Sequence, residues 1–147
     1  MASGVAVNNS CVTAMNDLVK ERKYRAVIFA INDEMTEIKL EKTFGPNSKN
    51  SRGGYEEFAK ALPDDSCRYA VYDFEYEHQG ATKNRIIFLL WSSDLSKVRT
   101  KLIYSSSAEG LVSKLGAGVQ RQIQVTDRDE LSYDEVAKKL VQHTAGY

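Results

Sequence analysis

The hydrophobic positions of the chain change from helical spacing to strand spacing and back several times. Near the start, Cys11, Met15 and Leu18 recur at helical spacing behind polar residues that can cap a helix. A helix is therefore predicted there, and it ends in a short basic run. The residues ahead of it, 1–8, are small and uncharged, which predicts a flexible N-terminal tail.

Five segments carry the pattern of strands. The segments 24–31 and 86–91 are almost continuously apolar, as strands covered on both faces should be. The segment 35–42 alternates between apolar and polar residues, which predicts a half-buried strand. The segment 67–77 also alternates, so that Tyr72, Phe74 and Tyr76 share one face and the acidic residues between them share the other. A short final strand is predicted around 123–125.

Two helices are predicted between these strands. The first spans 55–62 and follows a polar loop over 44–54. The second is expected to begin near Asp94 and to stop at Gly116, with a bend or a new start at the capping box that Ser106 opens.

A last helix is predicted after the final strand, because Ser132 and Glu135 form a capping box ahead of apolar residues at helical spacing. Helices thus precede, separate and follow strands that are apolar on both faces. The predicted fold class is α/β, of the α+β type. It is a single domain over 9–145, with a central mixed β-sheet sandwiched between α-helices.

The charges are balanced overall but unevenly distributed. The 147 residues include 20 Lys plus Arg and 20 Asp plus Glu, so the net charge gives no general attraction to nucleic acid or to membranes. The basic run 20–25 is short and Glu21 interrupts it, which argues against a nucleic-acid site. Residues 55–80 hold seven acids against two bases, whereas residues 83–121 hold seven bases against two acids. The second stretch predicts a basic surface that suits an acidic partner.

Cysteine usage and hydropathy indicate the compartment. Cys11 and Cys67 lie in unrelated segments and are interpreted as reduced thiols. No apolar run near the N-terminus suits a secretory signal, and no stretch reaches the length of a membrane span. We therefore expect a soluble, cytoplasmic protein with no membrane insertion.

The acidic strand residues Asp73, Glu75 and Glu77 share one face, and such a stripe could hold a metal or act as an acid and base. A solvated face is the more common explanation, and hard cations need further oxygen ligands that no loop supplies. His78 lies in a turn and His143 near a helix end, with no nucleophile arranged beside them. We expect a protein that is not an enzyme, with no catalytic residues, no metal and no cofactor.

The long predicted helix carries a cation within its apolar arc. At the angular step of an α-helix, Arg99 falls inside the arc formed by Leu95, Val98 and Leu102. In one interpretation, the guanidinium extends past buried neighbours to water. In the other, Arg99, Lys101 and Leu102 face a partner, because arginine beside exposed apolar groups is typical of interface centres.

Four long motifs keep a common order along the chain. They are M-A-S-G-V at 1–5, Y-A-V-Y-D-F-E-Y-E at 69–77, I-I-F-L-L-W at 86–91, and V-R-T-K-L-I-Y-S-S-S at 98–107. Together they resemble the actin-depolymerising factor/cofilin family. The resemblance extends from Met1 to the terminal helix and implies a single actin-depolymerising-factor homology domain.

The resemblance also assigns residues to two binding surfaces. The surface for both monomeric and filamentous actin would comprise Ser3, Gly4, Val5, Arg99, Lys101 and Leu102. The positions needed only on filaments would be Lys83, Arg85, Lys138 and Lys139. Ser3 would be the regulatory phosphorylation site.

The function implied is that of a monomeric protein of the actin cytoskeleton that prefers ADP-bound actin and promotes filament severing and depolymerisation. Phosphatidylinositol bisphosphate headgroups would compete for the basic surface. The alternative is a coactosin-like or glia-maturation-factor-like domain. Such a domain binds filaments or the branched-filament nucleating complex without severing.

Three features depart from the family's pattern. Ser93 stands where a proline is usual, the loop 44–54 looks longer than is common, and Gln142 replaces a frequent basic residue in the last helix. Gln142 predicts a weaker or different filament site. The basic insert that carries a nuclear signal in vertebrate relatives is not evident, so nuclear entry is possible but has no clear signal.

Overall fold

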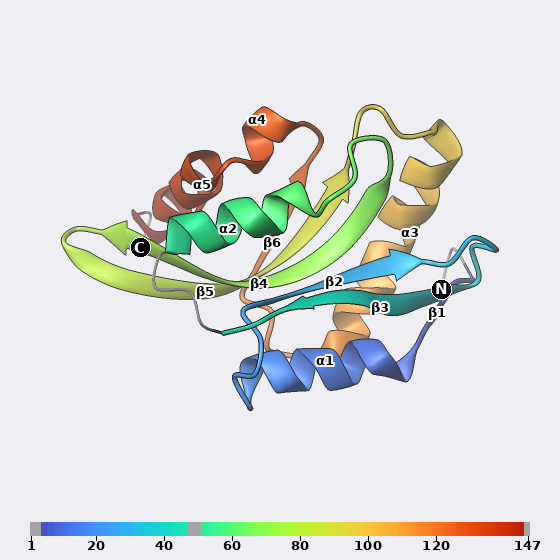
Figure 1. Cartoon of the computed structure of the whole chain (residues 1–147), viewed down its shortest axis with the longest axis horizontal. Helices are drawn as coiled ribbons and strands as arrows, with labels where there is room; N and C mark the ends of the chain where they lie inside the picture. The colour runs from blue at the N-terminus through green and yellow to red at the C-terminus, as the bar shows by residue number, and fades with distance from the viewer. Residues whose placement is uncertain (1–3, 47–50, 146–147) are drawn as a thin grey trace.

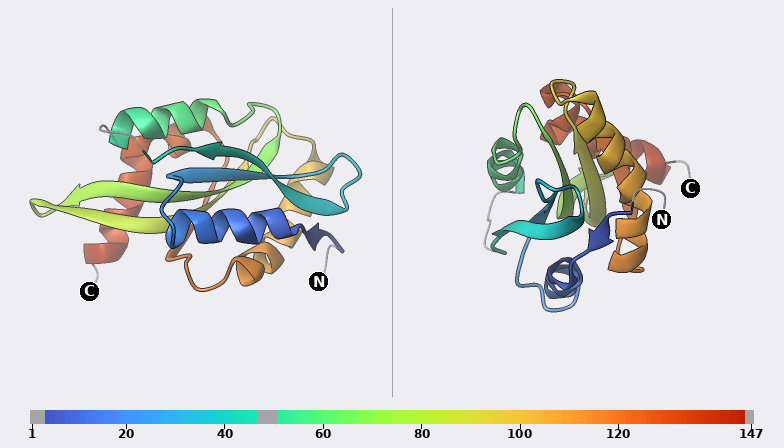
Figure 2. Two further views of the ribbon diagram at one scale, coloured as in Figure 1. Left: turned by 60° about the horizontal axis from the view of Figure 1, so that its bottom comes forward. Right: turned by 90° about the vertical axis from the view of Figure 1, so that its right-hand side faces the viewer.

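The computed structural model describes residues 4–46 and 51–145, which form a β-sheet between two layers of helices (Figures 1 and 2). Six strands follow one another across the sheet in the order β1-β3-β2-β4-β5-β6. The pairs β1–β3 and β5–β6 are parallel, and the other neighbours are antiparallel. The strands are β1 (Ala6–Val7), β2 (Ala26–Ile31), β3 (Glu37–Phe44), β4 (Cys67–His78), β5 (Ala81–Ser92) and β6 (Arg121–Val125).

Helices cover both faces of this sheet. On one face lie α1 (Asn9–Val19) and α3 (Val98–Leu115). On the other face lie α2 (Ser51–Lys60), α4 (Arg128–Leu131) and α5 (Tyr133–Ala145). The predicted class, a mixed sheet sandwiched between helices in one α+β domain, is confirmed.

The alternation of β4 divides the core into two halves. Tyr69 and Val71 pack toward α1 and α3, whereas Tyr72, Phe74 and Tyr76 pack toward α2 and α5. All five side chains are buried. The face predicted for the three alternating aromatic residues is confirmed, and burial of both sides of β4 fixes its register in the sheet.

The predicted tail over 1–8 is wrong at its inner end. Ala6–Val7 forms β1, which pairs with β3 through Ala6 and Glu37. Val5 is 1% exposed and belongs to the core beneath α1 and α3, and the Asn8 side chain caps α1 by accepting from the Ser10 amide. An apolar segment this short lacks a readable period, so only its tertiary partner reveals the strand. The ordered domain therefore begins before residue 9.

The predicted long helix differs from α3 in two respects. Helix α3 begins at Val98 and not near Asp94. It also continues without a restart at Ser106, whose hydroxyl donates to the Ile103 carbonyl. A hydroxyl bonded to the preceding turn is compatible with a helix interior, so the capping-box pattern there is not used. Its predicted stop is confirmed, because Gly116 has a φ of +89°.

Two other boundaries also shift, and one predicted cap is confirmed. Helix α2 begins at Ser51, which shortens the predicted loop 44–54, although residues 47–50 lie outside the described residues. Strand β5 begins at Ala81 right after the turn, so it contains two cations, Lys83 and Arg85, that were predicted to precede it. The Ser132 cap of α5 is confirmed by the bond from the Glu135 amide, 3.3 Å long.

Candidate functional site

The first half of α3 is held by buried hydrogen bonds. The Tyr104 hydroxyl accepts from the Ile31 amide at 2.9 Å, and the Tyr69 hydroxyl donates to the Tyr104 carbonyl. Further along the helix, Leu111 and Leu115 are buried in the same core. These contacts fix one side of α3 to the sheet, so its opposite side is presented to solvent in a defined orientation.

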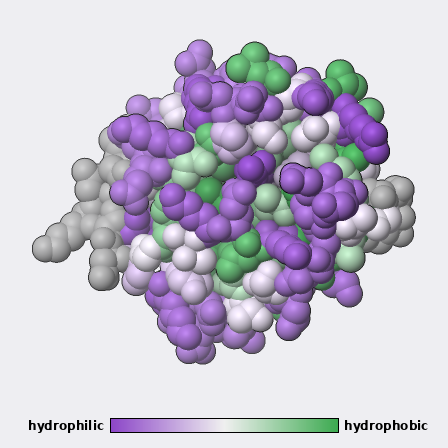
Figure 3. All heavy atoms as spheres, turned by 45° about the vertical axis from the view of Figure 1, so that its right-hand side comes forward, coloured by the Kyte–Doolittle hydropathy of each residue, from purple (hydrophilic) through white to green (hydrophobic). Residues whose placement is uncertain are grey.

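The outer side of α3 and the turn that precedes it carry large apolar side chains. Leu95 is 73% exposed, Val98 is 69% exposed and Leu102 is 64% exposed, with Arg99 exposed beside them. Figure 3 brings the α3 side of the molecule forward and shows apolar surface atoms bordered by hydrophilic ones. The apolar residues beside Arg99 are therefore not buried, so its guanidinium does not need to extend past them to reach water. The interpretation in which these residues face a partner is favoured.

The N-terminus of α3 concentrates positive charge. Lys97 is the N-cap and makes no capping hydrogen bond through its side chain, the first turn has no acidic residue, and Arg99 and Lys101 follow directly. Cations near the positive end of a helix dipole, beside unsatisfied amides, are unfavourable in isolation. An acidic partner would reverse this cost, so the arrangement suits an interface.

Strand β1 brings the beginning of the chain beside α3. Both elements contribute to one core, and Figure 1 places β1 at the same end of the molecule as the first turn of α3. Gly4 is exposed, whereas Val5 is buried and so needs correction as a contact residue. Ser3 lies outside the described residues. We define the helix surface as the exposed residues Gly4, Leu95, Val98, Arg99 and Leu102 together with the half-buried Lys101.

The second predicted set lies at the other end of the sheet (Figure 1). β4 and β5 extend beyond their neighbours as a two-stranded ribbon, in which Lys83 pairs with Tyr76 and Arg85 with Phe74. Directly opposite residues of a strand pair share a face, and both tyrosine and phenylalanine here pack toward α5. Lys83 and Arg85 therefore lie on the α5 side of the sheet.

Helix α5 supplies the other two cations. Val136 and Leu140 bury one face of the helix, which leaves Lys138 exposed and Lys139 half-buried. Hydrogen bonds from Thr126, with a smaller contribution from Lys139, lower the pKa of the Glu130 carboxyl. The structure thus places all four predicted filament residues on one side of the sheet, and we call Lys83, Arg85, Lys138 and Lys139 the basic surface.

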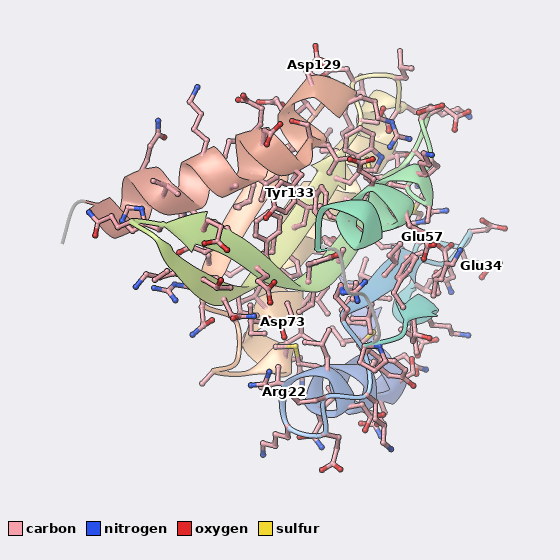
Figure 4. All side chains as sticks on the ribbon, turned by 60° about the vertical axis from the view of Figure 1, so that its left-hand side comes forward. Arg22, Glu34, Glu57, Asp73, Asp129 and Tyr133 are labelled. Atoms are coloured by element: carbon pink, nitrogen blue, oxygen red, sulfur yellow. The ribbon has the colours of Figure 1, made fainter. Side chains whose placement is uncertain are left out.

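The acidic stripe of β4 occupies the opposite side of the ribbon (Figure 4). Asp73 lies 3.7 Å from Arg22 and accepts from Asn84, while Glu75 and Glu77 are exposed. Among the described residues, no group of three or more His, Cys, Asp or Glu is placed to hold a metal ion. The stripe is a solvated face with local ion pairing.

The two thiols are buried in the core, and the described helices lack the character of membrane spans. Burial raises the pKa of the Cys11 thiol to about 11, which keeps it protonated and unreactive at neutral pH. Cys67 is buried against the Ser96 hydroxyl at 3.4 Å. Over the described residues, none of the helices combines the length and hydropathy needed to cross a bilayer.

Comparisons with known proteins find relatives that match nearly the whole chain. A family model described as cofilin/tropomyosin-type actin-binding protein matches residues 4–141. The chain is 40% identical over 140 residues to cofilin from Saccharomyces cerevisiae, covering 94% of this chain and 93% of that protein. It is 36% identical over 137 residues to actophorin from Acanthamoeba castellanii, with 93% and 95% covered. The crystal structure of Streptomyces griseoflavus cofilin matches with a TM-score of 0.83 at 36% identity, covering 95% of this chain and 98% of that chain.

Proposed function

This chain belongs to the actin-depolymerising factor/cofilin family of actin-binding proteins, and we propose that its helix surface and its basic surface engage actin in two distinct ways. Its function is to bind actin and to promote the depolymerisation of filaments. The helix surface is used on both monomeric and filamentous actin. The basic surface acts on filaments alone.

The observation that carries this proposal is the outer side of α3. Exposed Leu95, Val98 and Leu102 offer an apolar centre, and Arg99 beside them adds a planar hydrogen-bond donor. The uncapped, cationic first turn supplies attraction to acidic groups of the partner. Binding and not catalysis is therefore the proposed activity.

Separation of the two surfaces explains how filaments are altered. The helix surface and the basic surface lie at opposite ends of the sheet, so they can reach two adjacent subunits of one filament (Figure 1). A protein that bridges two subunits biases their relative arrangement by its differential affinity for the altered one. We propose that this bias favours ADP-bound filaments and weakens the contacts between subunits, which promotes severing.

Co-sedimentation with ADP-actin filaments, combined with a count of filament ends, tests the proposal. Binding that produces new ends is the expected result. Binding without new ends would support the alternative, a coactosin-like or glia-maturation-factor-like domain. No binding to filaments or monomers would contradict the proposed function itself.

Phosphorylation of Ser3 is proposed to switch actin binding off. A phosphate adds a charge of about −1.5 to −2 one residue before Gly4 of the helix surface, where acidic groups of actin are proposed to dock. Ser3→Glu should therefore bind actin poorly while its circular dichroism spectrum and unfolding midpoint match those of the parent protein. Ser3→Ala is the matched control and should bind normally. Full affinity in Ser3→Glu would remove the regulatory role.

Phosphatidylinositol bisphosphate is proposed to compete with actin for the same cations. Its multiply charged headgroup and an acidic actin surface would both draw on Lys83, Arg85, Lys97, Arg99 and Lys101. Soluble headgroups should displace actin, and the competition should weaken as salt rises. Vesicles that carry actin through this protein would count against a shared surface.

We further propose that the protein is a monomer and that it acts in the cytoplasm on the actin cytoskeleton.

A further inference from the structure

Arg121, the first residue of β6, is held in an unusual state. Its Nε is buried and makes no hydrogen bond to any described residue. Among the described residues, its guanidinium donates a hydrogen bond from Nη1 to the Gln122 carbonyl at 3.5 Å, the outer limit for such a bond. The described residues supply no carboxylate within ion-pair distance of it. A buried donor without a partner destabilises the free protein.

The strand register places this guanidinium on the α5 side of the sheet. Arg121 pairs with Ile87 of β5, and Ile87 packs in the core beneath α2 and α5. Ile123, two residues further along β6, packs in the same core. Because alternate residues share a face, Arg121 lies on the same side as Lys83 and Arg85.

The register also sets the spacing of these cations. Arg85 precedes Ile87 by two residues, so its Cα lies about 8 Å diagonally from that of Arg121, given the usual rise and strand separation. The acidic residues of the neighbouring strand do not offset this charge. Figure 4 shows Asp73 on the opposite side of β4 from Tyr133 of α5. Glu75 and Glu77 alternate with the buried aromatic residues and share the face of Asp73.

Lys83 and Arg85 are likewise without a carboxylate partner among the described residues. Within the described part of the chain, the Arg85 side chain donates to the neighbouring Asn84 carbonyl, at 2.8 Å. A cluster of half-buried cations without counter-charges repels itself in the free protein. An acidic surface laid over the cluster would offset these charges and accept hydrogen bonds from the outer nitrogens of the guanidinium groups.

We propose that Arg121 is a further filament-binding residue, which extends the basic surface from β5 onto β6 and donates to a carboxylate of the second actin subunit. This inference rests on the proposed function. It predicts a trade-off, because the cation that binds the filament lies beside Lys83 and Arg85, and the repulsion among these charges destabilises the free protein. Removing Arg121 should weaken filament binding without weakening the fold.

The test is the substitution Arg121→Met, which keeps an unbranched apolar stem and removes the guanidinium. Filament affinity should fall about tenfold, and its dependence on salt should become shallower. Monomer affinity should be unchanged, and the urea midpoint should be equal or higher. Lys114→Met is the matched control, because Lys114 is an exposed cation in the last turn of α3, on the opposite face. It should leave both affinities unchanged.

A second substitution and a reference variant make the outcome decisive. Arg121→Lys, which restores the charge but not the planar donor, should recover part of the filament affinity. The double variant Lys83→Ala with Arg85→Ala is the reference, because the proposed function predicts that it loses filament binding. If it does so while Arg121→Met binds filaments normally, the inference is overturned and the proposed function stands. A lower urea midpoint with equal losses for monomer and filament would assign Arg121 to the fold and also overturn the inference. If the parent protein binds no filaments, the proposed function fails first.

Discussion

At the scale of single residues, Arg128 joins distant parts of the chain. Its Nε and Nη2 contact the Asp64 carboxylate, and it also donates to the carbonyls of Ala59 and Leu62 at 2.6 Å each. Its guanidinium lies 5.1 Å from the centre of the Trp91 ring. These contacts satisfy the end of α2 and attach it to α4. Nothing in the local sequence around position 128 indicates them, because every partner is remote in the chain.

Arg128→Ala should therefore lower the free energy of unfolding by about 2–3 kcal/mol. The estimate combines the lost hydrogen bonds with the lost ring contact and discounts the ion pair, whose side chains are 42% and 74% exposed. Urea unfolding measures the change. Lys60→Ala, which removes an exposed cation from the last turn of α2, is the control and should change stability by less than about 0.5 kcal/mol. A loss for Arg128→Ala as small as that of the control would contradict this role.

At the scale of elements, the turn before α3 shows what the sequence pattern missed. The Ser93 hydroxyl donates to the Asp64 carbonyl and accepts from the Leu95 amide, and Ser96 bonds back to the Ser93 carbonyl. A distant backbone group thus holds 94–97 as a turn, and the helix starts only at Val98. Periodicity placed Val98 and Leu102 on one helical face correctly, but Leu95 lies in the turn before the helix. It could not show which part of the arc the sheet covers.

Two leucines of α3 provide a matched test of that division. Leu102→Ala should leave the free energy of unfolding within about 0.5 kcal/mol of the parent value, because the side chain is 64% exposed, yet weaken actin binding several-fold. Leu111→Ala, on the same helix but fully buried, should cost about 2–5 kcal/mol of stability. Its actin affinity, measured under conditions where it is folded, should be retained. A large stability loss in Leu102→Ala would contradict the assignment of the helix surface.

At the scale of the whole molecule, the sequence predicted the central sheet, the two-sided burial of its middle strands and the segregation of charge. Each rests on a local pattern repeated over several residues. Strand register determines the features that the sequence did not predict. They are the pairing of β1 with β3, the projecting β4–β5 ribbon and the position of Arg121. Register is decided by packing between distant segments, which no local period records. The buried state of Val5, and so its loss as a candidate contact, follows from the same pairing.

The central claim is that two separate surfaces divide the work of binding monomers and filaments. The most direct test is to measure the affinity of two double variants for monomeric and for filamentous ADP-actin. The double variant Arg99→Ala with Lys101→Ala should lose affinity roughly thirtyfold or more for both forms of actin, because the helix surface is used in every complex. Lys83→Ala with Arg85→Ala should keep monomer binding and lose filament binding and severing, with circular dichroism confirming the fold of both. Equal losses of monomer affinity in the two variants would contradict the account.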